Sequence, residues 1–219
     1  VPASRKTPGV AFNVILGGAG TSAGDAPISI MLLGNKSAAV SVSSPTYAQA
    51  AGTAAVDTVV SIASSDDAAT MFGLGSELHI MSLAVFAQQP NAALFGCAVT
   101  EAGTAGTAVL TFVTSASAAG TVRLSLCGNI IDVPVASGDS VTTIASNVCT
   151  YVNTVTSLPY YAQNSAGAVT FTAKNTGPRA NVLVVDAYFI ASGAVVPSRI
   201  LAASATSSGF STTGQWTTS

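Results

Sequence analysis

The strongest indication of the fold is the stretch TVRLSLCGNIIDVPV, residues 121–135. Apolar residues alternate on both sides of Gly128-Asn129, which predicts two antiparallel strands joined by a two-residue turn. Pairing across that turn gives three apolar pairs, Leu126 with Ile131, Leu124 with Val133, and Val122 with Val135. The opposite face of the hairpin then carries the polar residues Arg123, Ser125 and Asp132.

A helix and two further strands are predicted after this hairpin. Gly138-Asp139-Ser140 can cap the helix, because a side-chain oxygen at that position accepts a hydrogen bond from a first-turn amide. One face of the helix is apolar, at Val141, Ile144, Val148 and Val152. Alternating runs predict strands at residues 169–173 and 181–189. Residues 105–191 are therefore predicted to form a compact β-β-α-β-β module.

Residues 28–104 are predicted to form a mixed α/β domain. Short apolar runs favour strands at residues 28–33, 59–62 and 94–99. Between the last two, Ser64-Ser65-Asp66-Asp67 resembles a capping box with acidic residues in the first turn, and Gly73 ends that helix at Met71-Phe72. Ser76 can cap a second helix at residues 77–88. That helix is apolar almost all round, so we expect it to be buried, within the molecule or in an assembly.

The two ends of the chain differ from the middle. Residues 1–27 contain one alternating strand, formed by Val10, Phe12, Val14 and Leu16, and no partner strand is predicted nearby. A flexible hinge is predicted after it, at Gly17, Gly18, Gly20 and Gly24. Residues 192–219 are predicted to be a Ser/Thr-rich tail or the start of a further domain; they cannot close a core alone, so we expect them to be mobile or held by a neighbour. The predicted fold class is α+β: a mixed α/β domain with an inserted β-β-α-β-β module and an extended N-terminal arm.

The composition excludes several classes of protein. Charged residues make up 7% of the 219 residues, against about 25% in an ordinary soluble domain. The net charge is −2 and the basic residues are scattered, so nucleic acid is not an expected partner. A hydrophobic fraction of 49% argues against disorder. The apolar runs are shorter than the roughly 20 residues of a membrane-spanning helix, and the basic start lacks the apolar core of a signal peptide. We therefore expect a soluble, unexported chain without membrane insertion.

No catalytic constellation is evident in the sequence. His79 is the only histidine, and its helix neighbours Ser76 and Ser82 are more typical of a surface or core pair than of a nucleophile with its base. The carboxylates are dispersed, without paired-acid or metal-loop spacing. We therefore expect a protein that is not an enzyme.

Cofactor and metal sites are not expected either. Cys97, Cys127 and Cys149 are widely spaced, which favours reduced thiols over a disulfide framework or a zinc site. Residues 18–23 match G-x-G-x-x-A, but Pro27 follows too soon for the helix that a dinucleotide site requires. This glycine-rich segment is therefore interpreted as a flexible linker.

Several short segments, in a fixed order along residues 7–190, together carry a family resemblance. They are TPGVAF at residues 7–12, SDDAATMFGLGSEL at 65–78, AGTV at 119–122 with Gly128, VPVASGDS at 133–140, and VTFTAKNTG at 169–177 with Ala180-Asn181. The first is similar to a Pro-Gly-Val start of an N-terminal arm, and the second to an acidic, Ala-rich helix that ends in Phe-Gly-x-Gly-Ser. The others are similar to a hairpin-helix module and to the strand and loop after it. This ordered set resembles the N-terminal part of contractile tail sheath proteins from Mu-like phages.

The resemblance implies a structural virion protein without catalysis. Such subunits polymerise as a helical sleeve around a tail tube and contract to drive the tube into the host. The implied partners are copies of the chain itself, the tail tube protein, and the baseplate and tail terminator proteins. The implied location is the virion tail, assembled in the host cytoplasm. Sheath subunits add strands from terminal arms to sheets of their neighbours, which would make the strand at Val10, Phe12, Val14 and Leu16 an inter-subunit arm.

A second interpretation is a receptor-binding, glycan-binding or decoration module of a virion. Ser/Thr-rich β-proteins with small side chains also build such modules. A glycan-binding module should show an aromatic cluster on which sugars stack. The five tyrosines are spread along the chain except for Tyr160-Tyr161. The sequence therefore favours the sheath interpretation.

Overall fold

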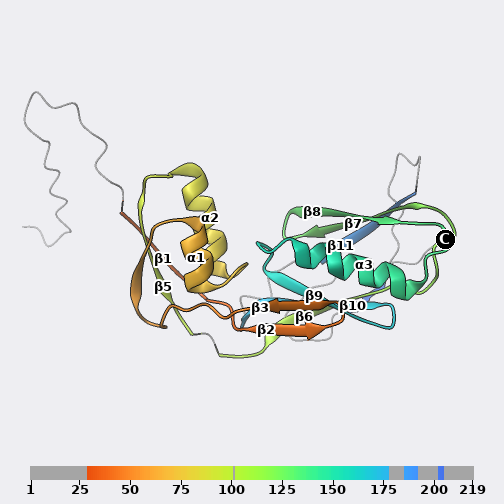
Figure 1. Ribbon diagram of the computed structural model, residues 1–219, viewed down its shortest axis with the longest axis horizontal. Coiled ribbons are helices and arrows are strands. Elements are labelled where there is room, and N and C mark those ends of the chain that lie inside the picture. Colours follow the sequence, from red (N-terminus) through yellow and green to blue (C-terminus); the bar gives the residue numbers. More distant parts are fainter. Residues whose placement is uncertain (1–28, 101, 178–184, 192–201, 205–219) are drawn as a thin grey trace, which may run out of the picture.

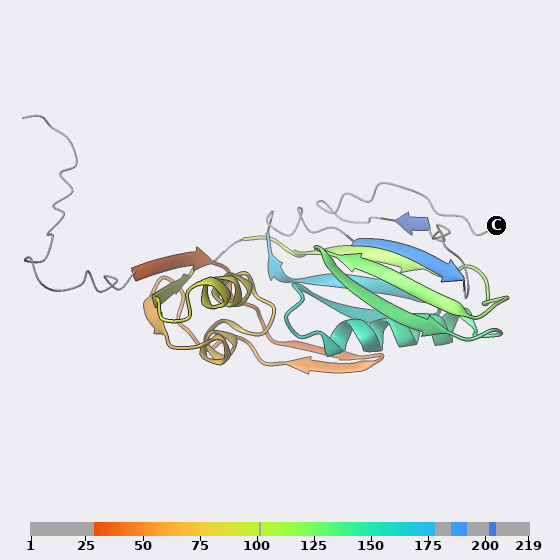
Figure 2. The same cartoon turned by 90° about the horizontal axis from the view of Figure 1, so that it is seen from above.

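The structure is a computed structural model that describes residues 29–100, 102–177, 185–191 and 202–204 (Figure 1). Helices and strands are both present, so the predicted α+β class is confirmed. The elements form two lobes that lie end to end (Figures 1 and 2). Each lobe has its own cluster of buried hydrophobic side chains. The two lobes are therefore packed as separate units.

The first lobe is a three-stranded sheet with two helices packed against it. Its elements are β1 (Ser29–Gly34), β4 (Val59–Ile62), β5 (Ala93–Ala98), α1 (Ser65–Phe72) and α2 (Glu77–Gln88). The strand order is β1-β5-β4, with β1 parallel and β4 antiparallel to β5. These strands and helices lie within one residue of the predicted bounds.

Both helices of the first lobe begin at the predicted serine caps. The Ser64 hydroxyl accepts a hydrogen bond from the Asp67 amide at 3.1 Å, and the Ser76 hydroxyl accepts one from the His79 amide at 3.2 Å. Gly73 ends α1 with a φ of 84°, a conformation that favours glycine. Only Leu78, His79 and Ser82 of α2 are buried. We expected the whole helix to be buried, in the molecule or in an assembly, and within this chain only one of its faces is.

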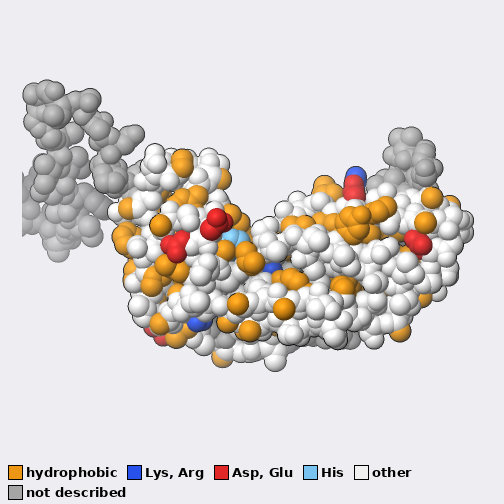
Figure 3. Space-filling view, viewed as in Figure 1, with side chains coloured by type: hydrophobic (Ala, Val, Ile, Leu, Met, Phe, Trp, Pro, Cys, Tyr) orange, Lys and Arg blue, Asp and Glu red, His pale blue; other side chains and the backbone are white. Residues whose placement is uncertain are grey.

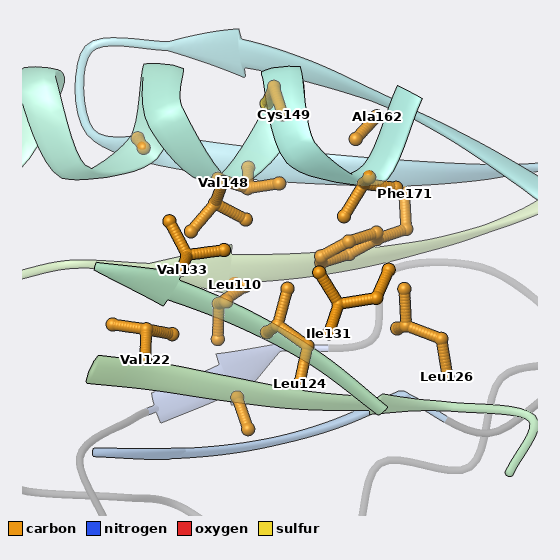
Figure 4. Close-up of a cluster of buried hydrophobic side chains, with 14 of the residues drawn as sticks. Leu110, Val122, Leu124, Leu126, Ile131, Val133, Val148, Cys149, Ala162 and Phe171 are labelled. Atoms are coloured by element: carbon orange, nitrogen blue, oxygen red, sulfur yellow. The ribbon is translucent and has the colours of Figure 1, made fainter. Parts of the chain in front are cut away.

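The second lobe consists of two antiparallel sheets and one helix, which buries one face against strands of both sheets. One sheet has the order β12-β6-β10-β9 and the other the order β11-β7-β8. The elements are β6 (Ala105–Thr111), β7 (Gly120–Leu126), β8 (Asn129–Val135), α3 (Val141–Thr154), β9 (Tyr160–Ser165), β10 (Ala168–Thr176), β11 (Val185–Ala191) and β12 (Ala202–Ser204). Side chains from both sheets and from α3 meet in its core (Figure 4). Burial raises the pKa of the Cys149 thiol in this core to about 12, which keeps it protonated.

The predicted register of the β7–β8 hairpin is wrong by two residues. The turn lies at Cys127-Gly128, not at Gly128-Asn129, and the pairs are Leu126 with Asn129, Leu124 with Ile131, and Val122 with Val133. Cys127 and Gly128 have φ angles of 49° and 83°, and positive φ at both turn positions matches the twist of paired strands. A shift of two residues leaves every side chain on its predicted face. The observed register also places Arg123 opposite Asp132. The two side chains form a bidentate ion pair with N···O distances of 2.7 Å.

Several strands were not predicted. They are β2 (Val40–Ser43), β3 (Thr46–Gln49), β6, β9 and β12. The hairpin of β2 and β3 lies beside the second lobe, although its sequence falls within residues 28–104 (Figure 1). β12 lies in the Ser/Thr-rich tail, where its three residues pair with β6 of the same chain. Among the described residues, none of the helices combines the length and the apolar run needed to cross a bilayer.

Candidate assembly surface

The predicted inter-subunit strand and hinge lie outside the described residues. They are Val10, Phe12, Val14 and Leu16 of the strand, and Gly17, Gly18, Gly20 and Gly24 of the hinge. The structure therefore leaves both predictions untested. A different surface with features of an interface lies on the first lobe.

This surface is the face of the first-lobe sheet that the helices leave uncovered. Ile30 and Leu32 of β1 pack with the first-lobe core, whereas Met31 and Leu33 point the other way and are 51% and 56% exposed. On β4, Val59 is 53% exposed. These side chains are cross-strand neighbours, because Met31 pairs with Phe95, and both Leu33 and Val59 pair with Cys97. We call Met31, Leu33, Val59, Phe95 and Cys97 the open face.

The open face carries no charge, and it is apolar apart from the exposed Ser29 and Ser61 on the same side of the sheet. The three strands that form it contain no Asp, Glu, Lys or Arg. Charged side chains are also sparse over the surface seen in Figure 3. Large apolar side chains gathered on one exposed face mark an interaction site more often than single ones do. Depletion of charge is typical of the buried centre of protein interfaces.

The strand arrangement gives a second reason to consider the open face an interface. β1 and β5 are parallel, and all-parallel sheets are covered on both faces almost without exception, whereas β4 is antiparallel to β5 and makes this sheet mixed. Here α1 and α2 cover one face only. The signal was present in the sequence, since an uninterrupted apolar run such as Ile30 to Leu33 is typical of a strand covered on both sides. We predicted the strand correctly but did not identify its second face.

The residues considered for catalysis are bonded to the backbone. His79 Nδ1 accepts a hydrogen bond from the Gly75 amide at 2.9 Å, and Ser82 Oγ donates to the Leu78 carbonyl at 2.7 Å. Ser76 caps α2. Burial, with a further effect of the Lys174 charge, lowers the pKa of His79, and Asp66 opposes that shift. His79 and Ser82 are therefore occupied in holding α2 and the loop before it.

The three cysteines are unpaired thiols at separate places. Cys97 and Cys149 are buried, and Cys127 is exposed in the β7–β8 turn. The Cys127 sulfur lies 3.3 Å from the Tyr160 hydroxyl. Within the part of the chain that the structure describes, no three His, Cys, Asp or Glu side chains gather as a metal site would require.

The adjacent tyrosines do not form a platform for sugars. Tyr160 is 1% exposed in the second-lobe core, and burial raises its pKa above the usual range. Tyr161 stacks on Tyr47, with ring centroids 6.1 Å apart and planes 15° apart. One face of the Tyr161 ring is thus covered by another ring of the same chain. Nothing in this geometry adds support to the glycan-binding interpretation.

Neither a model of a known protein family nor a curated protein matches this chain.

Proposed function

We propose that this protein is a structural subunit of the contractile tail sheath type. It polymerises with copies of itself around a tail tube in the virion, and it contracts to drive that tube into the host. The observation that carries the proposal is the open face, an uncharged apolar sheet face of Met31, Leu33 and Val59 that one more packed layer would cover. The ordered resemblance along residues 7–190 supports the same function.

The proposal assigns a role to each part of the chain. Residues 1–27 act as the extended arm, whose strand at Val10, Phe12, Val14 and Leu16 pairs with a neighbouring subunit. Residues 105–191 form the inserted module. The further partners are the tail tube, baseplate and tail terminator proteins. The subunit needs no cofactor and catalyses no reaction.

Deleting residues 1–16 is expected to abolish assembly without unfolding the chain. The strand in this segment would supply main-chain hydrogen bonds between subunits, and these are lost with it. Electron microscopy of the purified intact chain should show rings or tubes, whereas the truncated chain should remain monomeric with an unchanged circular dichroism spectrum. Normal tubes from the truncated chain would sink the arm assignment.

Replacing Leu33 with lysine is expected to raise the protein concentration required for assembly at least tenfold. The substitution places a charge on the open face, where a covering layer would have to desolvate it. Because Leu33 is 56% exposed, the free energy of unfolding should change by less than about 0.5 kcal/mol. Sedimentation velocity across a concentration series measures the assembly, and urea denaturation measures the stability.

The matched control for this variant is Ile130→Lys. Ile130 is 65% exposed on the β7–β8 hairpin of the other lobe, so the same charge is added away from the open face. This control should assemble like the unmodified chain. Equal effects of the two substitutions would show that the open face has no special part in assembly.

A further inference from the structure

The two lobes meet at a polar junction that belongs to neither core. The β2–β3 hairpin bridges them. Gln49 at its end donates hydrogen bonds to Ser37 Oγ at 2.9 Å, in the segment after β1, and to the Leu74 carbonyl at 2.8 Å, in the loop between α1 and α2. At its turn, the Ser44 carbonyl accepts from the Asn164 amide of β9 at 2.8 Å. Polar contacts between separately packed units permit relative movement.

A buried lysine of the second lobe lies in this junction. Lys174 of β10 is 4% exposed, and its ammonium donates to the Thr156 carbonyl at 3.0 Å. The Nζ atom lies 5.9 Å from the centre of the Tyr47 ring. A Cβ added to Gly75 of the first lobe would lie 2.6 Å from Nζ. Among the described residues the only carboxylate ion pair is Arg123–Asp132, so Lys174 has no such counter-ion there.

A buried histidine of the first lobe faces the same junction. His79 is 5% exposed near the start of α2, and its Nδ1 accepts the hydrogen bond from the Gly75 amide. Gly75 in turn lies against the Leu158 carbonyl and Lys174 of the second lobe. A neutral ring is required for this bond, because a protonated Nδ1 carries a hydrogen and cannot accept. His79 thus holds the loop that contacts the second lobe.

We propose that this junction is a proton-controlled joint, in which protonation of His79 on acidification breaks its bond to Gly75 and releases the first lobe from the second. The added charge also repels the ammonium of Lys174. The other titratable groups facing the joint are Tyr47 of β3 and Tyr161 of β9, and Asp66 of α1 acts on His79 from within the first lobe.

The direction in which pH changes the stability of the closed joint follows from the pKa shifts of His79 and Lys174. Burial first, and Lys174 second, lower the pKa of His79 from its ordinary 6.5. A base whose pKa is lowered in the closed joint takes up protons more readily in the open one. The closed joint is therefore weakened as pH falls from 6.5 to the lowered value, by up to tenfold in the opening equilibrium per pH unit.

Lys174 acts in the same direction at higher pH. Burial lowers its pKa from 10.5 to about 8, so the closed joint is also weakened as pH falls from 10.5 to 8. Below pH 8 this contribution is constant. An acid response between pH 7 and 5 would therefore come from His79.

Hydrogen exchange by mass spectrometry of the intact chain, from pH 8 to 5, tests the proposal. After correction for intrinsic rates, peptides covering residues 73–79 and 156–161 should lose protection together as pH falls. Peptides of the β7–β8 hairpin should stay protected, which separates opening of the joint from global unfolding. Because His79 is the only histidine, its ring proton signal in NMR gives the pH at which it titrates. The two midpoints should coincide.

The variant His79→Gln keeps an acceptor for the Gly75 amide but does not titrate. It should retain protection of both peptides at pH 5, whereas Lys174→Met should reduce the response because it removes the charge that disfavours protonation of His79. Unchanged protection in the original chain after His79 has titrated would overturn the proposal. A response in His79→Gln equal to that of the original chain would also overturn it. If that variant does not fold, the coincidence of the two midpoints in the original chain decides alone.

Discussion

Replacing Gly75 with alanine is expected to lower the free energy of unfolding by about 3 kcal/mol and to loosen the contact between the lobes. Gly75 has a φ of 71°, a left-handed conformation in which an L-residue is disfavoured by about 1–2 kcal/mol. The new Cβ would also meet the Leu158 carbonyl of the second lobe and lie 2.6 Å from Lys174 Nζ. Because a backbone carbonyl cannot move aside alone, this overpacking adds about 1–3 kcal/mol. Urea denaturation followed by circular dichroism measures the loss.

Gly128→Ala provides a matched control for that substitution. Gly128 has a φ of 83°, so alanine meets the same conformational penalty there. Its added Cβ would have no heavy atom within 4 Å. The control should therefore lose only about 1–2 kcal/mol. Equal losses in the two variants would show that the second lobe does not press against Gly75, contrary to the geometry of the junction.

The helices of the first lobe could be predicted closely because their signals are local. Ser64, Gly73 and Ser76 act on amides or carbonyls within a few residues, so the sequence contains both partners of each bond. The strand at residues 59–62 is bounded in the same local way. For such elements, the tertiary structure changes little of what the neighbouring residues already favour.

The register of the β7–β8 hairpin and the formation of β6, a strand rich in small residues, do not follow from the local preferences of the residues involved. The hairpin turn is decided by the left-handed conformation of Cys127, a residue with no special preference for it. β6, with the sequence AGTAVLT, contains residues that are poor strand formers, and it is a strand because β10 and β12 pair with it on either side. Neither pairing is visible from residues 105–111 alone.

The candidate surfaces show the same division. The apolar run that contributes to the open face can be recognised in the sequence, because Met31 and Leu33 alternate with Ile30 and Leu32. The contact between His79, Gly75 and Lys174 cannot be predicted from the sequence. His79 and Lys174 lie far apart in the chain, and only the packing of the α1–α2 loop against the loop before β9 brings both of them to Gly75. From the sequence, His79 was considered as a base and interpreted instead as part of a surface or core pair, and Lys174 was given no role.

The separation of the two cores has a testable energetic consequence in the first lobe. Phe72 at the end of α1 is fully buried, and its ring packs against Gly96 of β5 and near Ile62 of β4. Replacing Phe72 with alanine removes the largest side chain of this core. We expect a loss of about 3–5 kcal/mol, the range for deletion of a buried phenylalanine ring. A small core has few other contacts to offset that loss, so the first lobe should unfold before the second.

Calorimetry and hydrogen exchange of Phe72→Ala should then show two transitions, with the β7–β8 hairpin protected after the first-lobe strands have lost protection. Phe171→Ala is the matched control, because Phe171 is equally buried in the core of the other lobe and should reverse the order. A single transition that shifts by the same amount in both variants would contradict separate unfolding. It would require coupling between the lobes stronger than a few polar contacts at the junction supply, and such coupling would oppose movement of one lobe against the other. Two transitions would instead mean that the second-lobe core stays folded after the first lobe has unfolded, so that the contacts at the junction do not make the two cores unfold as one unit.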